Sequence, residues 1–463
     1  MMPSKSNFTP VDSISQPASA GHRSKRVKWI ATICLIPMVL FGLFLCYLAY
    51  RETMAYRELN DKLVAIRQAG EPIDDESMAK HYEKTTHKEG TEAWTEALEL
   101  VRSTNAIAGR LPVVGEGNLP RDFGPGVEWP DEPRVAEFLR EVRPLLNKIY
   151  IADAFPKPVW MPIAFDGYFT SQEVLQSTRS LARILELDTS HALFHKEGER
   201  ALKDIRSLQS VARAFDSEIS MVTKMITTAI QSMHKDSINR SLAMAVWNDE
   251  QLAELSEQAR QPYDVPKAWK SSFVGERALA LTAVRDSRSL ARSIGDYNNP
   301  LYRLPILPSG KLSFLRAFDA ALDVSSASTS ELVGRAKVAE QTLLQRTSVD
   351  FLTGPFFPAV VSFAEMFDRD EVFRRLTVTS LGVKRFQLLN KRFPKNLPEL
   401  ANLGLMDRDW TTTNRDVFGY EVENEIAYVW TYGTADKKTI PRSRPILTPD
   451  MDPGSLWNVV TIR

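Results

Sequence analysis

Residues 29–50 read WIATICLIPMVLFGLFLCYLAY and contain no charged side chain. Each residue of an α-helix adds about 1.5 Å along its axis, so these 22 residues would extend over roughly 33 Å. The hydrocarbon core of a bilayer is about 30 Å thick. The stretch therefore predicts a transmembrane helix, with a short tail before it and a polar body over residues 51–463 after it.

Basic side chains gather on the N-terminal side of this stretch. Four of them stand within residues 23–28, whereas residues 51–62 mix basic with acidic side chains. Lysine and arginine favour the cytoplasmic side of a span. We therefore expect a single-pass protein of the bacterial inner membrane, with a cytoplasmic N-terminus and a periplasmic body.

A cleaved signal peptide and a lipoprotein acylated at Cys46 are the alternatives to an uncleaved anchor. A signal peptide has a shorter apolar core and a cleavage site of small residues, which residues 46–51 (CYLAYR) do not offer. A lipoprotein cysteine follows a small residue, whereas Leu45 is large. The sequence thus favours an anchor that stays in the lipid bilayer through residues 29–50.

Charge and cysteine content limit the functions open to the body. The chain has 58 basic and 58 acidic side chains, and the first 28 residues hold five basic and one acidic, so the remainder carries a net charge of −4. A body so close to neutral, without a basic patch interleaved with aromatic residues, argues against nucleic-acid binding. Both cysteines, Cys34 and Cys46, lie in the apolar stretch, so the body has none to form a disulfide.

The patterning predicts a mainly α-helical protein made of five segments. Residues 1–28 are rich in Ser and Pro and low in large apolar side chains, which is typical of disorder. The predicted segments are a disordered basic tail at 1–28, the transmembrane helix at 29–50, a stalk helix with a Gly/Pro-rich connector at 51–133, a helical domain at 134–358, and a long helix with a small α+β cap at 359–463.

Apolar residues recur at helical spacing through most of the body. The stalk should continue the membrane helix until Gly70, and a later helix should end near Asp188. Gly198 then stands in a turn between two helices, a hairpin that resembles half of a tetratricopeptide repeat. Asn248 and Gln251 form a helix-start signal in which each side chain bonds the other's backbone N–H.

The last 200 residues combine irregular segments, helices and a β-hairpin. Residues 261–312 contain five prolines and should be irregular apart from a helix over 276–290. Residues 353–361 (TGPFFPAVV) should be a break before a long helix over 359–391. YEVEN and EIAYVWTYG then alternate as strands around a tight turn at 424–425, and the tail after 437 should hold at most one short strand.

The C-terminal block resembles the globular end of the major pseudopilins of type II secretion. There a long helix leads to Tyr-Pro, a Leu-rich segment, Asp-Pro-(Trp/Phe)-Gly and a small hairpin that ends in Ser-x-Gly-x-Asp. The matching residues are Phe393, Pro394, Leu397, Leu400, Asp416, Phe418, Gly419, Tyr428, Tyr432, Gly433 and Asp436. The resemblance implies a helix-plus-hairpin cap over residues 359–463.

Two departures from the pseudopilin pattern bear on function. Val417 replaces the usual proline, and KKT follows Asp436 in place of a glycine-rich calcium loop. The anchor also lacks the prepilin peptidase signature, so the chain is not a pilin subunit. We expect no cofactor, with calcium at Asp436 as the alternative.

A broader resemblance covers most of the body. The order of one span, the stalk VAIRQAGEPI, the helical segments LARILELD and GERALKDIRSLQSVAR, the start WNDEQLAEL and the C-terminal block is similar to a large group of membrane-anchored planctomycete proteins. That resemblance implies the same architecture and names no catalytic residue.

Histidines and acidic clusters are the candidates for chemistry. His191 and His195 lie four residues apart and would share a helix face, as metal ligands do, but no third ligand stands at a recognisable spacing. We therefore expect solvated or packing histidines and no metal, and the same holds for His81 and His87. The acids at 74–76 and at 368–371 should be helix-start charges; a paired-carboxylate site is the alternative.

The remaining signals favour binding over catalysis. The sequence has no Gly-x-Ser-x-Gly elbow, Walker loop or Ser-x-x-Lys set. Five tryptophans could line a cleft, although burial in a helical core is their commoner fate: Trp94, Trp129, Trp160, Trp247 and Trp269. We expect a non-catalytic interaction or scaffolding protein of the cell envelope with a protein partner; the alternative is an envelope hydrolase built from dispersed carboxylates and histidines.

Overall fold

The protein is described by a computed structural model, with some segments left out of the description. The described residues are 20–83, 87–104, 109–120, 123–161, 163–167, 170, 173–244, 247–261, 263–294, 305–347, 360–432, 440, 444 and 457–463. Asp436 and residues 353–359, for which the sequence predicts a calcium alternative and a break, lie outside them.

A single helix, α1 (Ala20–Gln68), carries the apolar stretch and the stalk. It is the one described helix that is long and apolar enough to cross a membrane, a property that a membrane anchor and a signal sequence share. The stalk ends as predicted, because Gly70 takes a left-handed φ of 72° just beyond the last turn. The helix begins at Ala20, earlier than composition indicates, since a formed helix extends easily through lysine and arginine.

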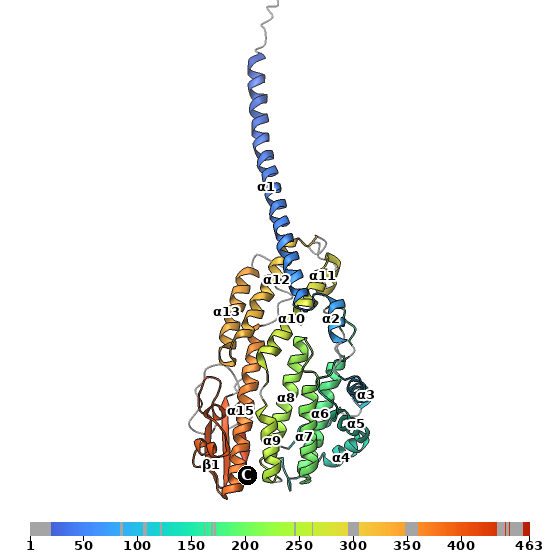
Figure 1. The fold of residues 1–463 in the computed structure, drawn as a ribbon, viewed down its shortest axis with the longest axis vertical. Coiled ribbons are helices and arrows are strands. Elements are labelled where there is room, and N and C mark those ends of the chain that lie inside the picture. The colour runs from blue at the N-terminus through green and yellow to red at the C-terminus, as the bar shows by residue number, and fades with distance from the viewer. Residues whose placement is uncertain are drawn as a thin grey trace, which may run out of the picture.

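The body below α1 is mainly helical (Figure 1). Its helices are α2 (Asp75–Tyr82), α3 (Lys88–Thr104), α4 (Glu132–Glu141), α5 (Arg143–Asp153), α6 (Glu173–Phe194), α7 (Gly198–Ala214), α8 (Met221–Ser241), α9 (Asp249–Arg260), α10 (Val265–Ala283), α11 (Ser287–Ile294), α12 (Pro308–Asp323), α13 (Thr329–Thr347) and α15 (Val360–Asn390), with 3-10 turns η2 (Val324–Ser326), η3 (Leu397–Leu403) and η4 (Asp407–Trp410).

The C-terminal half of α1 packs on α12, which fixes the helix to the body. Ala55 and Leu59 form an apolar cluster with Leu312 and Leu315. Polar contacts run alongside this cluster: Lys62 with Asp319 at 2.6 Å, Arg316 with Glu58 at 2.7 Å, and Ser309 with Glu52 at 2.7 Å. The stalk is therefore part of the folded body rather than a free tether.

Two helix starts that the sequence indicates are confirmed. The Asn248 side chain accepts from the Gln251 N–H at 2.8 Å, and the Gln251 side chain accepts from the Asn248 N–H at 3.1 Å. Asp74 caps α2 through Ser77 in the same reciprocal way. Each such cap contributes about 1 kcal/mol by satisfying N–H groups that a helix start leaves free.

Two helix boundaries differ from prediction. The helix expected to end near Asp188 continues to Phe194, because the hydroxyls of Thr189 and Ser190 bond carbonyls one turn back and nothing there breaks it. Residues 265–275 are helical rather than irregular, and the helix expected over 276–290 is divided, because α10 ends at Ala283 and α11 begins at Ser287. Pro266 stands in the first turn of α10, where proline starts a helix instead of breaking it.

The long helix α15 is confirmed, and it contributes to two cores. Phe363 and Phe367, near its start, pack with residues of α10, α12 and α13. Leu376 and Leu381, further along, pack with residues of α6 to α9 and of the C-terminal sheet. One helix thus joins the cap to the rest of the body.

The cap carries a three-stranded antiparallel sheet, of which the sequence predicts the first two strands. Strands β1 (Gly419–Glu423) and β2 (Ile426–Tyr432) pair around Asn424 and Glu425, whose φ values of 50° and 64° suit a tight hairpin. The short strand allowed for in the tail is β3 (Trp457–Ile462), which pairs with β2.

Candidate functional site

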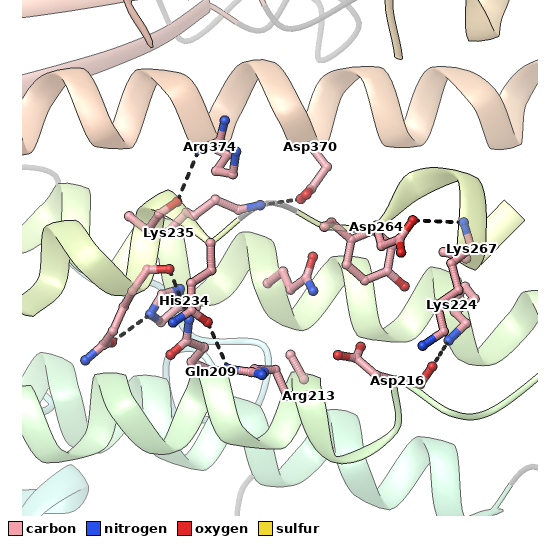
Figure 2. Close-up of a pocket in the computed structure, with 17 residues that line it drawn as sticks. Gln209, Arg213, Asp216, Lys224, His234, Lys235, Asp264, Lys267, Asp370 and Arg374 are labelled. Atoms are coloured by element: carbon pink, nitrogen blue, oxygen red, sulfur yellow. Dashed lines mark hydrogen bonds and ion pairs between the residues drawn. The ribbon is translucent and has the colours of Figure 1, made fainter. Parts of the chain in front are cut away.

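A polar cavity of about 230 Å³ opens between α7, α8, α9, α10 and α15 (Figure 2). Five basic side chains line it: Arg213, Lys224, Lys235, Lys267 and Arg374. Three carboxylates, Asp216, Asp264 and Asp370, also line it. These residues come from segments that are far apart in the sequence, so no local sequence motif predicts the cavity.

One wall of the cavity is a buried ion pair. Lys235 and Asp370 are 4% and 7% exposed, and the ammonium donates to the carboxylate. Charges taken out of water are stable only when they are paired this way. The pair holds α8 against α15 at the middle of the body.

The opposite wall holds buried polar groups that make fewer hydrogen bonds than they could. Lys224 is 1% exposed and donates to the backbone oxygen of Asp216 at 2.5 Å. Among the described residues, Asp216 Oδ1 and the Tyr263 hydroxyl have no hydrogen-bond partner. Burial lowers the pKa of Lys224 to about 8 and raises the pKa of Asp216. Unsatisfied buried groups are rare and often face a bound molecule or water.

His234 also lines the cavity, and its Nε2 lies 3.5 Å from the side-chain oxygen of Gln258 (Figure 2). Burial, helped by the neighbouring Lys235, lowers its pKa to about 4, so the imidazole is neutral near pH 7. The cavity thus offers an ammonium group, a phenol, a carboxylate and a neutral imidazole to a small polar molecule.

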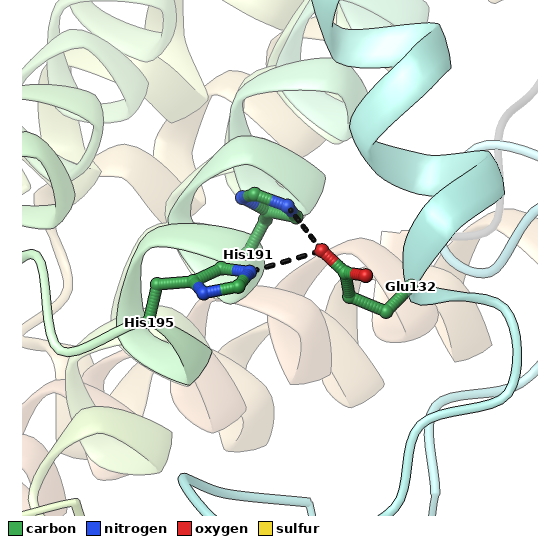
Figure 3. Close-up of side chains that lie close together, drawn as sticks. All are labelled: Glu132, His191 and His195. Atoms are coloured by element: carbon green, nitrogen blue, oxygen red, sulfur yellow. Dashed lines mark hydrogen bonds and ion pairs between the residues drawn. The ribbon is translucent and has the colours of Figure 1, made fainter.

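The predicted histidine pair lies elsewhere, at the end of α6. His191 is in the helix and His195 follows its last residue, so both imidazoles face the same side. Glu132, the first residue of α4, reaches them from another element (Figure 3). Its Oε1 is 3.2 Å from His191 Nε2 and 3.0 Å from His195 Nε2. The hydrogen bond from His195 is the largest cause of the lowered pKa of Glu132, and burial lowers the pKa of His191.

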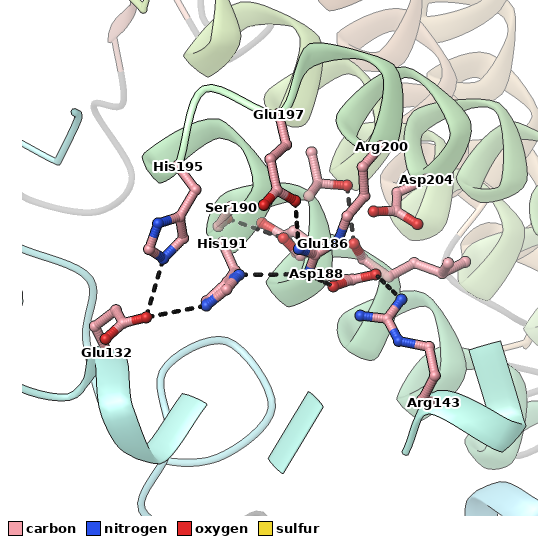
Figure 4. A network of polar contacts seen from close by, with 12 residues as sticks. Glu132, Arg143, Glu186, Asp188, Ser190, His191, His195, Glu197, Arg200 and Asp204 are labelled. Atoms are coloured by element: carbon pink, nitrogen blue, oxygen red, sulfur yellow. Dashed lines mark hydrogen bonds and ion pairs between the residues drawn. The ribbon is translucent and has the colours of Figure 1, made fainter. Parts of the chain in front are cut away.

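Behind this cluster is a network of charges (Figure 4). Arg200 of α7 contacts His191 Nδ1 at 3.3 Å and also pairs with Asp188 and Glu197. Asp188 is fully buried and accepts a second contact from Arg143 at 3.4 Å. The network fixes the end of α6 against α5 and α7.

The other predicted histidines serve packing and capping. His81 stacks edge-on against Trp160, with ring centroids 5.0 Å apart. His87 Nδ1 accepts from the Gly90 N–H at 3.0 Å at the start of α3. Both positions agree with the expectation of histidines that support local structure.

The acidic clusters divide between helix starts and buried contacts. Asp74, Asp75 and Glu76 stand at the start of α2, as predicted. The second cluster lies inside α15 instead, where it binds neighbouring elements: Asp368 accepts from Thr413 at 2.6 Å, and Glu371 pairs with Arg374 and Arg375 at 2.7 Å. The prediction of helix-start charges is wrong for this second cluster, because residues 368–371 lie about two turns inside the helix, which begins at Val360.

The five tryptophans are all buried in cores, which confirms the commoner fate expected of them: Trp94, Trp129, Trp160, Trp247 and Trp269. Sequence reasoning missed Glu132 and the cavity. Glu132 stands 59 residues before His191, so only the packing of α4 on α6 brings it there. No family model, curated protein or solved structure matches the chain.

Proposed function

We propose that this protein is a single-pass protein of the bacterial inner membrane whose periplasmic body binds a protein partner in the cell envelope and has no catalytic role of its own. The observation that carries the proposal is the two-part character of α1. Its first part is apolar and exposed, and its second part is packed into the body.

The exposed part of α1 supports a place in the bilayer. Large apolar side chains are mostly exposed there, with Met38 71% and Phe41 61% exposed. Such a surface is unstable in water and is satisfied by lipid. The basic residues before it and the mixed charges after it support the outward direction of the body.

The packed part of α1 supports a scaffolding role. Because the stalk is fixed to α12 by an apolar cluster and flanking polar contacts, the body stands on the membrane at a set orientation. The end with α11 and α12 faces the bilayer, while α4, α9 and the sheet lie at the far end (Figure 1). Because the stalk is packed on the body, the far end of the body is held in one orientation. A partner that binds there loses little conformational entropy on binding.

The helical hairpin and the cap support the same role. Helices α6 and α7 pack together around the turn at residues 195–197, an arrangement typical of helical interaction modules. The sheet of the cap, whose sequence resembles the globular end of pseudopilins, adds a further surface at the far end of the body. The repeat character of the hairpin region stays a prediction.

The hydrolase alternative, a site of dispersed carboxylates and histidines, predicts a polar pocket that gathers at least two free carboxylates with shifted pKa values. In the described wall of the cavity, Asp370 is paired with Lys235, and Asp264 caps α10 by accepting from the Lys267 N–H at 3.1 Å. Of the three carboxylates among the described lining residues, this leaves only Asp216 free, so the cavity does not hold a pair of free carboxylates. The geometry favours binding.

In vivo crosslinking followed by capture tests the proposal. The full-length protein carries a tag at its cytoplasmic N-terminus, and the segment 1–68 with the same tag is the control for capture through the anchor alone. We expect an envelope protein that crosslinks to the full-length chain and not to the control. Identical captures from both would refute a role for the body in binding.

A further inference from the structure

We propose that Glu132, His191 and His195 form a binding site for a divalent transition metal, with Zn²⁺ as the ion that suits it best. The cluster joins two elements, because Glu132 begins α4 while the histidines stand at the end of α6. One ligand atom from each residue lies within 4.8 Å of the other two. The site is separate from the proposed partner binding and does not depend on it.

The distances from Glu132 to the two histidines are close to those between the ligand atoms of a metal site. In a tetrahedral zinc site with bonds of about 2.0–2.1 Å, neighbouring ligand atoms stand about 3.3 Å apart. Glu132 Oε1 lies 3.2 Å and 3.0 Å from the two Nε2 atoms. The three side chains converge on one point (Figure 3). Small outward shifts of the three side chains would therefore place one ligand atom from each at bonding distance from a central ion.

The residue types select the class of ion. Two imidazoles and one carboxylate suit zinc and its neighbours in the first transition row, whereas calcium and magnesium prefer oxygen ligands. Three protein ligands leave one coordination position for water or another small ligand. His195 is 40% exposed, which leaves a path for the ion from solvent.

Aromatic residues shield the cluster on its inner side. The ring of Trp129 lies 6.3 Å from that of His191, and Phe194 lies edge-on to His195 at 5.2 Å. Phe123 packs on Trp129 at 5.1 Å. An apolar shell of this kind strengthens the attraction between a cation and its ligands by excluding water.

Arg200 distinguishes the metal-free from the metal-bound arrangement. In the structure it donates to His191 Nδ1 at 3.3 Å, so the imidazole proton is on Nε2 and is shared with Glu132. Metal at Nε2 moves that proton to Nδ1, where Arg200, a donor only, is no longer a partner. Its contacts with Asp188 and Glu197 remain available to hold it after it swings away.

Cobalt and zinc titration tests the site directly. The full-length protein without a polyhistidine tag is purified in detergent, dialysed against a chelator and titrated with Co²⁺, whose visible absorption reports nitrogen and oxygen ligands in a tetrahedral site. Zn²⁺ is then added in competition. We expect one Co²⁺ per chain, a tetrahedral spectrum, and loss of that spectrum on addition of Zn²⁺.

Matched variants tie the signal to these residues. His195→Gln and Glu132→Gln should weaken Co²⁺ binding at least tenfold, while His22→Gln, which removes a histidine outside the cluster, should leave it unchanged. His195 follows the last residue of α6 and is exposed, so its variant keeps the fold, which circular dichroism checks. The proposal is overturned if the wild-type protein gives no tetrahedral spectrum, or if both cluster variants bind Co²⁺ as tightly as wild type.

Discussion

The buried pair of Lys235 and Asp370 shows how a single residue supports the junction of two helices. Removing one partner leaves the other charge buried without compensation, which costs about 3–5 kcal/mol. We expect Lys235→Met to lower the melting temperature of the full-length protein in detergent strongly. The double variant Lys235→Met, Asp370→Leu should recover much of that loss, because no buried charge remains. A double variant that melts below Lys235→Met would contradict this account of the pair.

Glu276 makes stability depend on pH. Burial raises its pKa from 4.5 to about 7, while the Met221 N–H donates to it at 3.1 Å. The folded protein therefore binds more protons than the unfolded chain between pH 4.5 and pH 7, so stability from this group is present below pH 4.5 and lost as pH rises to 7. The shift corresponds to about 3 kcal/mol.

The variant Glu276→Gln isolates this effect, because the amide oxygen can still accept from Met221. We expect the melting temperature of the variant, relative to wild type, to be higher at about pH 8 than at about pH 5. Measurements at the two pH values use the same detergent and ionic strength. An equal difference at both would mean that Glu276 does not titrate in this range.

Hydrogen bonds between polar residues close together in the sequence can be predicted from the sequence. Hydrogen bonds between distant residues cannot. Asn248 and Gln251 bond each other across three residues, so their spacing alone announces the cap. Glu132 meets His191 across 59 residues, and no spacing rule covers that distance. The prediction for the second carboxylate cluster fails because these acids lie well inside α15, where Asp368 and Asp370 contact Thr413 and Lys235 of distant segments.

At the scale of elements, Gly275 permits the close approach of α10 to the segment before α8. A Cβ atom at this position would lie 1.7 Å from the carbonyl oxygen of Ile219. Gly275→Ala should therefore lower the melting temperature by many degrees. Gly334, in α13, has open space around it, so Gly334→Ala should raise stability by roughly 1 kcal/mol through helix propensity. Similar effects from both substitutions would contradict the packing described for α10.

The contact between α1 and α12 depends on burial more than on ion pairs. Leu315 is fully buried in the cluster, and truncation of such a leucine costs about 2–5 kcal/mol. The pair of Arg316 and Glu58 is about half exposed, and such pairs contribute less than about 1 kcal/mol. In hydrogen exchange on nanodisc-embedded protein, Leu315→Ala should therefore expose the amides of residues 52–68, and Arg316→Ala should barely do so.

Helix identity is easier to predict than helix boundaries. The 3.6-residue apolar spacing announces the stalk of α1 and most of α15. By composition, Pro266 predicts the end of a helix. It lies instead in the first turn of α10, where proline favours the start of a helix. The strand β3 follows residues outside the described set and forms only because β2 offers an open edge, which is a tertiary condition.

At the scale of the whole molecule, α1 consists of two parts with different surroundings. From Leu35 to Tyr50 the described side chains of α1 are almost all exposed, whereas the end of the helix packs on the body. Composition and charge asymmetry are enough to predict this division. They cannot reveal that the stalk packs on the body, because this contact depends on α12, which begins 240 residues after α1 ends.

The side of the membrane on which the body stands is the most direct test of the proposed function. With Cys34 and Cys46 changed to alanine, single cysteines are placed at exposed Ala401 in the cap and at Ser15 in the tail. Spheroplasts are then treated with a membrane-impermeant maleimide. We expect Ala401→Cys to be labelled at once and Ser15→Cys only after the membrane is opened. Protection of Ala401→Cys in sealed spheroplasts would contradict a body exported beyond the inner membrane.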